Sequence, residues 1–87
     1  MPKYYFNVQD TEFYPDEEGQ ELADHGAAFR EAVSAARELA CGEVMRGQLE
    51  PHHRIDVVDE LGQAVTTVTF ADAAGIVMGE IAQETAP

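Results

Sequence analysis

One long amphipathic segment, Asp24 to Arg46, constrains the fold of this chain more than any other feature. It reads DHGAAFREAVSAARELACGEVMR, and its apolar residues recur at three- and four-residue spacing, as on one face of a helix. The face that this spacing predicts contains Phe29, Ala32, Val33, Ala36, Leu39, Ala40 and Val44. A single helix cannot bury such a face by itself, so the segment indicates a helix that lies on a sheet.

Both ends of the predicted helix carry residues that helix ends favour. Asp24 is a suitable N-cap, because its carboxylate can accept hydrogen bonds from the free amides of the first turn. Gly47 directly follows Arg46 and tolerates the left-handed conformation in which many helices end. We therefore expect the helix to run from Asp24 to about Arg46, since Pro51 forbids much continuation.

Two strands are predicted before the helix. Residues Lys3 to Asp10 alternate in polarity, so that one set of side chains faces the core and Tyr5 lies on the opposite face. The core-facing set is Tyr4, Phe6 and Val8. Glu12 to Tyr14 is expected to form a short second strand, and the acidic sequence DEEG at 16–19 predicts a turn.

Two more strands are predicted after the helix, at Arg54 to Asp59 and at Ala64 to Phe70, with a tight turn at 60–62. In the last strand Val68 and Phe70 share one face and Val65 lies on the other. The order is therefore ββαββ, which predicts an α+β fold with one long helix packed on one face of a four-stranded antiparallel sheet.

The end of the chain is expected to contribute little to this fold. Asp72 is expected to cap one short turn, and residues 79–87 to form a flexible tail after a single domain at 1–78. The apolar residues of that turn are Ala73, Ala74, Ile76 and Val77. The predicted core of the domain consists of Phe6, Phe29, Val33, Leu39, Ile55, Val57, Val68 and Phe70.

The charge of the chain narrows the classes of partner. Seventeen acidic against five basic residues in 87 give a formal net charge of -12, which repels nucleic acids and anionic membranes and suits a basic protein partner. The simpler interpretation is a solvated acidic surface. No apolar run approaches the length of a membrane span and no signal peptide is apparent, so we expect a cytoplasmic protein.

No combination of residues predicts catalysis, a cofactor or a metal site. His52 and His53 are adjacent, so they cannot both point to one face of a strand, and His25 is distant in sequence. The acidic turn lacks the spacing of a calcium loop. Cys41 has no visible base and is expected to be a half-buried spacer.

Two further groups of side chains are expected to have structural roles. The acidic residues before the helix are predicted to protect an edge strand from pairing with other chains. They are Asp10, Glu12, Asp16, Glu17, Glu18, Glu21 and Asp24. Arg30 and Arg37 share a helix face, where they could hold an acidic partner, although salt bridges to neighbouring acids are the simpler expectation.

Four stretches of the chain resemble a group of small bacterial proteins of unknown function. They are the opening MPKYYFNVQD, the turn PDEEGQEL, the helix AAFREAVSAARELA and the hairpin RIDVVDELGQAVTTVTF. The resemblance covers about residues 1–77 and implies a ββαββ fold without a known activity, so no catalytic residue can be carried over. The chain departs from the group in its pair His52–His53 and its longer tail. A weaker likeness to HicB-type antitoxins rests on analogy alone.

These observations lead to two functional hypotheses. The first is a small non-enzymatic interaction protein that forms a homodimer through the free face of its sheet. The residues expected at that interface are Tyr5, Asn7, Val65 and Thr67. The alternative is an antitoxin-like or inhibitor-like acidic subunit that binds a basic partner protein. An enzyme, a nucleic-acid-binding protein and a membrane protein are not expected.

Overall fold

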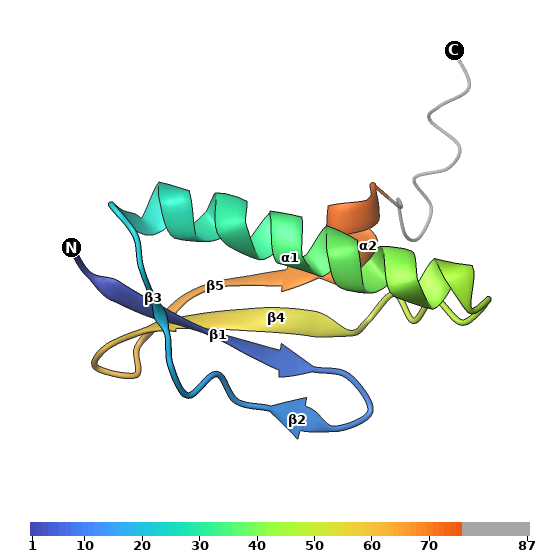
Figure 1. Cartoon of the computed structure of the whole chain (residues 1–87), viewed down its shortest axis with the longest axis horizontal. Helices are drawn as coiled ribbons and strands as arrows, with labels where there is room; N and C mark the ends of the chain where they lie inside the picture. Colours follow the sequence, from blue (N-terminus) through green and yellow to red (C-terminus); the bar gives the residue numbers. More distant parts are fainter. Residues whose placement is uncertain (76–87) are drawn as a thin grey trace, which may run out of the picture.

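The computed structural model describes residues 1–75, which form one main helix against an antiparallel sheet (Figure 1). The elements are β1 (Lys3–Gln9), β2 (Phe13–Tyr14), β3 (Gln20–Glu21), α1 (His25–Met45), β4 (Arg54–Asp59), β5 (Ala64–Thr69) and α2 (Phe70–Ala74). The predicted α+β class and long helix are confirmed, whereas the predicted ββαββ order is only partly matched, because the sheet has five strands. The expected tail at 79–87 and the boundary at residue 78 lie outside the described residues.

The strand that the sequence did not reveal, β3, completes one edge of the sheet. The hydrogen-bonded order is β2-β1-β4-β5, and β3 also pairs with β1. Tyr4 lies opposite Gln20 of β3, whereas Val8 lies opposite Tyr14 of β2. Because β4 occupies the other side of β1 along its whole length, β2 and β3 together form one interrupted edge strand.

Both predicted ends of α1 are confirmed. The side chain of Asp24 accepts a hydrogen bond from the Ala27 amide at 2.8 Å, as an N-cap should. At the other end Gly47 has a φ of +73°, and its amide donates to the carbonyl of Val44 at 2.9 Å. A glycine is needed there because a side chain would strain this left-handed conformation.

The buried face of α1 is narrower than predicted and consists of alanines and, near its end, Glu43. Four alanines spaced four residues apart are at most 2% exposed, and we call them the alanine row: Ala28, Ala32, Ala36 and Ala40. Phe29 is 47% and Leu39 42% exposed, so their predicted place in the core was wrong. Successive residues are rotated by about 100°, which puts Phe29, next to Ala28, and Leu39, next to Ala40, on opposite flanks of the row.

The core between the alanine row and the sheet is built mainly from β4, β5 and α2. Ile55, Val57, Val68 and Phe70 are at most 2% exposed, as predicted, and Tyr4 of β1 is equally buried. Phe6 and Val33, also predicted in the core, are partly buried at its margin. The small alanine side chains let the helix approach the sheet closely enough for these larger residues to fill the space.

The last strand differs from its predicted form at both ends. Val57 lies opposite Thr66 and Val58 opposite Ala64, which leaves Val65 unpaired in a β-bulge. Val65 packs against the core cluster instead of standing on the free face, so its predicted orientation was wrong. A bulge cancels one step of the strict alternation on which that prediction depended.

The expected terminal turn is present as α2, but it begins earlier. Phe70 is its first residue, and the hydroxyl of Thr69 caps it by accepting a hydrogen bond from the Asp72 amide at 3.0 Å. Asp72 was therefore wrongly predicted as the cap and lies in the first turn. Ile76 and Val77, expected in the same turn, lie outside the described residues.

The helices cover the two halves of the sheet to different degrees. α1 packs against β4, β5 and α2, and Figure 1 shows β2 at the edge of the sheet that is far from the helix. A helix with its side chains is about 10–12 Å wide, and neighbouring strands are about 4.8 Å apart, so one helix covers about two strands. Within residues 1–75 the helix-side face of β1 and β2 is therefore less completely covered: Tyr4 is 2% exposed and Phe6 and Val8 are partly buried, whereas Tyr14 is 51% exposed.

Candidate functional site

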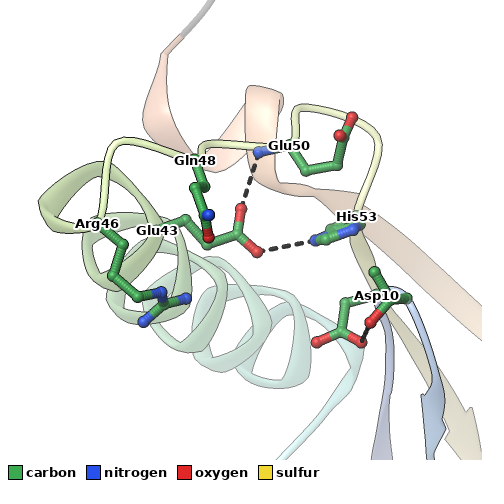
Figure 2. Close-up of a pocket in the computed structure, with 7 residues that line it drawn as sticks. Asp10, Glu43, Arg46, Gln48, Glu50 and His53 are labelled. Atoms are coloured by element: carbon green, nitrogen blue, oxygen red, sulfur yellow. Dashed lines mark hydrogen bonds and ion pairs between the residues drawn. The ribbon is translucent and has the colours of Figure 1, made fainter.

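A pocket of about 320 Å³ lies where the C-terminal end of α1 meets the connector to β4 and the loop after β1. Its lining residues are Asp10, Thr11, Glu43, Arg46, Gln48, Glu50 and His53. Figure 2 shows Glu43 between the helix and the connector, with His53 on one side and Arg46 on the other. The pocket is thus polar and brings together side chains from three separate segments.

Glu43 is the most buried charged residue among those described, at 7% exposed. Its Oε2 lies 2.8 Å from Nδ1 of His53, and its Oε1 accepts a hydrogen bond from the Glu50 amide at 2.8 Å (Figure 2). Its carbonyl also accepts from the Gln48 amide at 2.9 Å, which completes the turn that ends α1. One residue therefore fastens the connector to the helix through side chain and backbone.

His53 is held by packing as well as by this carboxylate. Its ring meets the ring of Phe70 edge to face, with centroids 5.6 Å apart, and its carbonyl accepts from the Phe70 amide at 2.7 Å. The side chain of His53 is only 16% exposed. Its neighbour His52 is exposed.

The chemistry that this pocket offers is limited. The orientation of His53 by Glu43 resembles the base and orienting residue of a nucleophilic enzyme, but the lining includes no serine or cysteine, and the Thr11 hydroxyl lies 3.5 Å from Asp10. Cys41 is exposed, not half-buried as expected, and is not among the lining residues. The arrangement is best explained as a structural clamp.

The remaining histidine lies at the opposite end of α1. His25 begins the helix and contacts Tyr4 edge to face, with ring centroids 5.7 Å apart. Within residues 1–75 no three histidine, cysteine, aspartate or glutamate side chains are arranged to hold a metal ion. None of the helices in this part of the chain is long and apolar enough to cross a membrane.

Among the acidic residues before α1, Asp16 is bound to the backbone of the sheet. Its Oδ2 accepts a hydrogen bond from the Phe6 amide of β1 at 3.1 Å, and its Oδ1 accepts from the amides of Glu18 and Gly19 at 3.2 Å. Its own amide donates to the side chain of Asn7 at 2.8 Å. At the gap between β2 and β3, the Asp16 carboxylate thus binds the β1 backbone where a strand would otherwise pair.

These contacts change the acidity of Asp16. Burial by itself raises the pKa of the carboxyl, but the three backbone amides that donate to it act in the opposite direction, and together they lower its pKa below the usual value. On β2, the carboxylates of Glu12 and then Asp10 raise the pKa of the Tyr14 hydroxyl. Of these two pKa shifts, only that of Asp16 involves the backbone of the sheet.

Gly19 closes the acidic turn and lies against the free face of the sheet. A Cβ atom at this position would come within 2.9 Å of the side chains of Lys3 and Tyr5, and the φ of Gly19 is +72°. The turn predicted at 16–19 is therefore confirmed, and it can be closed only by a glycine. The turn also partly covers Tyr5, which the sequence suggested would be available to a second copy.

The free face of the sheet is polar at its centre. Asn7 and Asp56 lie opposite each other there, and Asp56 accepts hydrogen bonds from Nε of Arg54 and from the Thr67 hydroxyl, each at 3.0 Å. Of the four residues expected at an interface, Tyr5, Asn7 and Thr67 share this face, whereas Val65 does not. Alternation along the strands revealed the face but not the polar network across it.

Arg37 has a role that the sequence did not indicate. A salt bridge to a neighbouring acid was the simpler expectation, but Nε of Arg37 donates to the Ala73 carbonyl at 2.8 Å and so ties α2 to α1. Arg37 follows Ala36 by one residue, and therefore the flank of the alanine row that contains Arg37 and Phe29 faces β5 and α2. The opposite flank, with Leu39, faces β1.

Comparison with known proteins identifies a family but no activity. A family model described as a domain of unknown function, DUF6894, matches residues 3–71, which confirms the resemblance to a small family of this kind. Searches of curated proteins and of solved structures gave no match. The likeness to HicB-type antitoxins therefore gains no support from these comparisons.

Proposed function

Because the chain belongs to the DUF6894 family, a domain of unknown function, its surface has to carry the argument, and we propose that it is a non-enzymatic, cytoplasmic protein-interaction module. The observation that supports this proposal is the helix-side face of β1 and β2, which residues 1–75 cover incompletely. One helix covers about two of the strands in a sheet whose main path has four. An apolar face without a helix is a common place for another chain to bind.

The uncovered surface, here called the open half, consists of Phe6, Val8 and Tyr14 on the sheet and Leu39 on the facing flank of α1. Tyr14 lies opposite Val8, so both point to the helix side of the sheet. Tyr14 is 51% exposed and Leu39 42%, while Phe6 and Val8 are partly buried. These side chains offer apolar area to a partner without any rearrangement of the core.

The charges around the open half favour a basic partner. Glu31 belongs to the same flank of α1 as Leu39, eight residues earlier, and Asp10 and Glu12 border Tyr14 on the sheet side. Glu12 and Asp10 raise the pKa of Tyr14, which supports a negative potential at this border. A basic amphipathic segment would therefore find apolar contacts in the middle and opposite charges at the rim.

Affinity capture with paired variants tests this proposal. The bait Leu39→Glu places a charge in the open half, and the control Leu61→Glu makes the same change at a hairpin tip where Leu61 is 83% exposed. We expect an extract of the native host to yield the same basic protein on the wild-type and Leu61→Glu baits but not on Leu39→Glu. Equal loss from both variants would show that charge alone governs capture and would contradict the proposal.

Homodimer formation is the second candidate function, and one feature of the free face favours it. Tyr5 and Val58 lie opposite each other there, and both are half-buried apolar residues at one end of the polar network. A charge at this point, Tyr5→Glu, should give a folded monomer if the free face is the contact. Sedimentation of this variant beside the wild type tests that arrangement.

A further inference from the structure

The two edges of the sheet are protected to very different degrees. The β2–β3 edge is broken into two strands of two residues each, contains Pro15 and has the carboxylate of Asp16 on the Phe6 amide. The other edge, β5, is a run of six residues, AVTTVT, without charge, proline or glycine. Natural sheets usually blunt an exposed edge with such residues, so an edge without them is available for pairing.

The backbone groups that β5 leaves free can be assigned from one hydrogen bond. The Phe70 amide donates to the His53 carbonyl at 2.7 Å, which points toward β4. Because amides alternate in direction along a strand, those of Val68 and Thr66 also point toward β4, and that of Thr67 points outward. Thr67 is exposed and lies beyond the bulge at Val65, in the regular part of the strand.

The distribution of charge makes this edge the place where two copies of an acidic chain can meet. The acids of the segment 10–21 lie along the β2–β3 edge, on the other side of the sheet from β5. The nearest acid to Thr67 is Asp56 on β4, which is paired with Arg54. Across a joined edge the two copies of Asp56 would be about 14 Å apart, three strand spacings of about 4.8 Å. That distance exceeds the screening length of about 8 Å at physiological salt.

We propose that β5 pairs antiparallel with β5 of a second copy, with the twofold axis at Thr67. The Thr67 residues of the two copies would then exchange both backbone hydrogen bonds, and Thr66 would lie opposite Val68 of the second copy. This register keeps the helix-side residues of both copies on one face, as antiparallel pairing requires. The result is one continuous sheet with its acidic edges at the two far ends.

The exposed Phe29 gives this contact an apolar component. Phe29 lies on the flank of α1 that faces β5 and α2, the flank on which Arg37 contacts Ala73. At 47% exposed it is one of the large apolar side chains that the fold leaves uncovered on this flank. A second copy joined at β5 would lie beside this flank, so part of Phe29 would become buried.

This inference rests on self-association, the second candidate function, and is independent of the open half. The matched test is a pair of substitutions at one residue. Thr67→Pro removes the outward amide and leaves the inward hydrogen bonds of β5 intact, whereas Thr67→Val removes only the hydroxyl that donates to Asp56. In sedimentation over a wide concentration range, we expect the wild type and Thr67→Val to dimerise and the dissociation constant of Thr67→Pro to rise about tenfold or more.

Amide hydrogen exchange of the wild type provides a test that needs no folded variant. Protection of the Thr67 amide should increase with protein concentration, because only the dimer covers it. A wild type that sediments as a monomer at every concentration would overturn both the edge contact and self-association. Unchanged dimerisation of Thr67→Pro, with loss of dimer in Tyr5→Glu, would overturn the edge contact and place self-association on the free face.

Discussion

The two halves of the sheet are stabilised by different forces. The half formed by β4 and β5 lies under α1 and α2, and its inward side chains Ile55, Val57 and Val68 are at most 2% exposed. Within residues 1–75 the half formed by β1 and β2 is less covered toward β2, where Tyr14 is 51% exposed, and its edge is held by the polar contacts of Asp16. The first half therefore depends on apolar burial, and the second on a carboxylate that has to be charged.

The largest expected effect is in the covered half. Phe70→Ala should lower the free energy of unfolding by about 3–5 kcal/mol, because the ring is 1% exposed and its removal leaves a cavity. The matched control in the half formed by β1 and β2 is Phe13→Ala, where the side chain is 52% exposed. Denaturant unfolding followed by circular dichroism measures both. Similar losses for the two variants would remove the distinction between the halves.

The next effect is in the half formed by β1 and β2. Asp16→Asn keeps the shape of the side chain but can place an amide donor against the Phe6 amide, so we expect a loss of about 1–3 kcal/mol. Glu17→Gln makes the same charge change on an exposed neighbour and should cost less than about 0.5 kcal/mol. Hydrogen exchange should show the loss first in the amides of β1 and β2. Uniform loss across the sheet would mean that the halves unfold together.

Acid should weaken the half formed by β1 and β2 before the half formed by β4 and β5. The pKa of Asp16 is lowered in the folded chain, so its contribution is complete above the unfolded pKa of about 3.9 and is lost as pH falls through the lower folded value. The stability difference between the wild type and Asp16→Asn should therefore be constant near neutral pH and shrink below about pH 4. A difference that stays constant down to pH 2 would contradict this role of the carboxylate.

The sequence predicted elements whose pattern is local and long. Alternation identified β1 and β4, and the capping residues Asp24 and Gly47 identified the ends of α1. It missed β3, because two residues are too short for any pattern. It also misjudged which face of α1 is buried, because large apolar side chains were given more weight than alanines. Alanines fill the interface because the helix lies close to the sheet, and the sequence does not show this distance.

The candidate site was less predictable than the fold, and the reason is that its contacts join distant residues. Glu43 and His53 are ten residues apart and meet only because the chain reverses at Gly47. Asp16 was included among the acidic residues, but nothing in its neighbours indicated that it would accept from the Phe6 amide. Composition showed that acids are abundant, and tertiary structure decides which one has a defined partner.

A smaller effect is expected at Phe29, which lies on the flank of α1 that faces β5 and α2. At 47% exposed it should contribute about 1 kcal/mol, roughly half the value of a fully buried side chain. Phe29→Ala should therefore remain folded and lose far less stability than Phe70→Ala. Thermal unfolding at low protein concentration, where a dimer would dissociate, measures this contribution separately. A loss above about 3 kcal/mol would mean that Phe29 belongs to the core.

The smallest expected effect is that of salt, and it should also distinguish the halves. A chain with a formal charge of -12 repels itself, and within residues 1–75 the Arg54–Asp56 ion pair compensates few of its acids. Moderate sodium chloride should screen the repulsion and stabilise the fold by about 0.5 kcal/mol, equivalent to about 2–4 °C in melting temperature. Because the acids of segment 10–21 border the open half, the gain in hydrogen-exchange protection should be larger for β1 and β2 than for β4 and β5. An equal gain in both halves would mean that the repulsion is spread over the whole surface, and a lower melting temperature would mean that the acids are paired more closely than these contacts indicate.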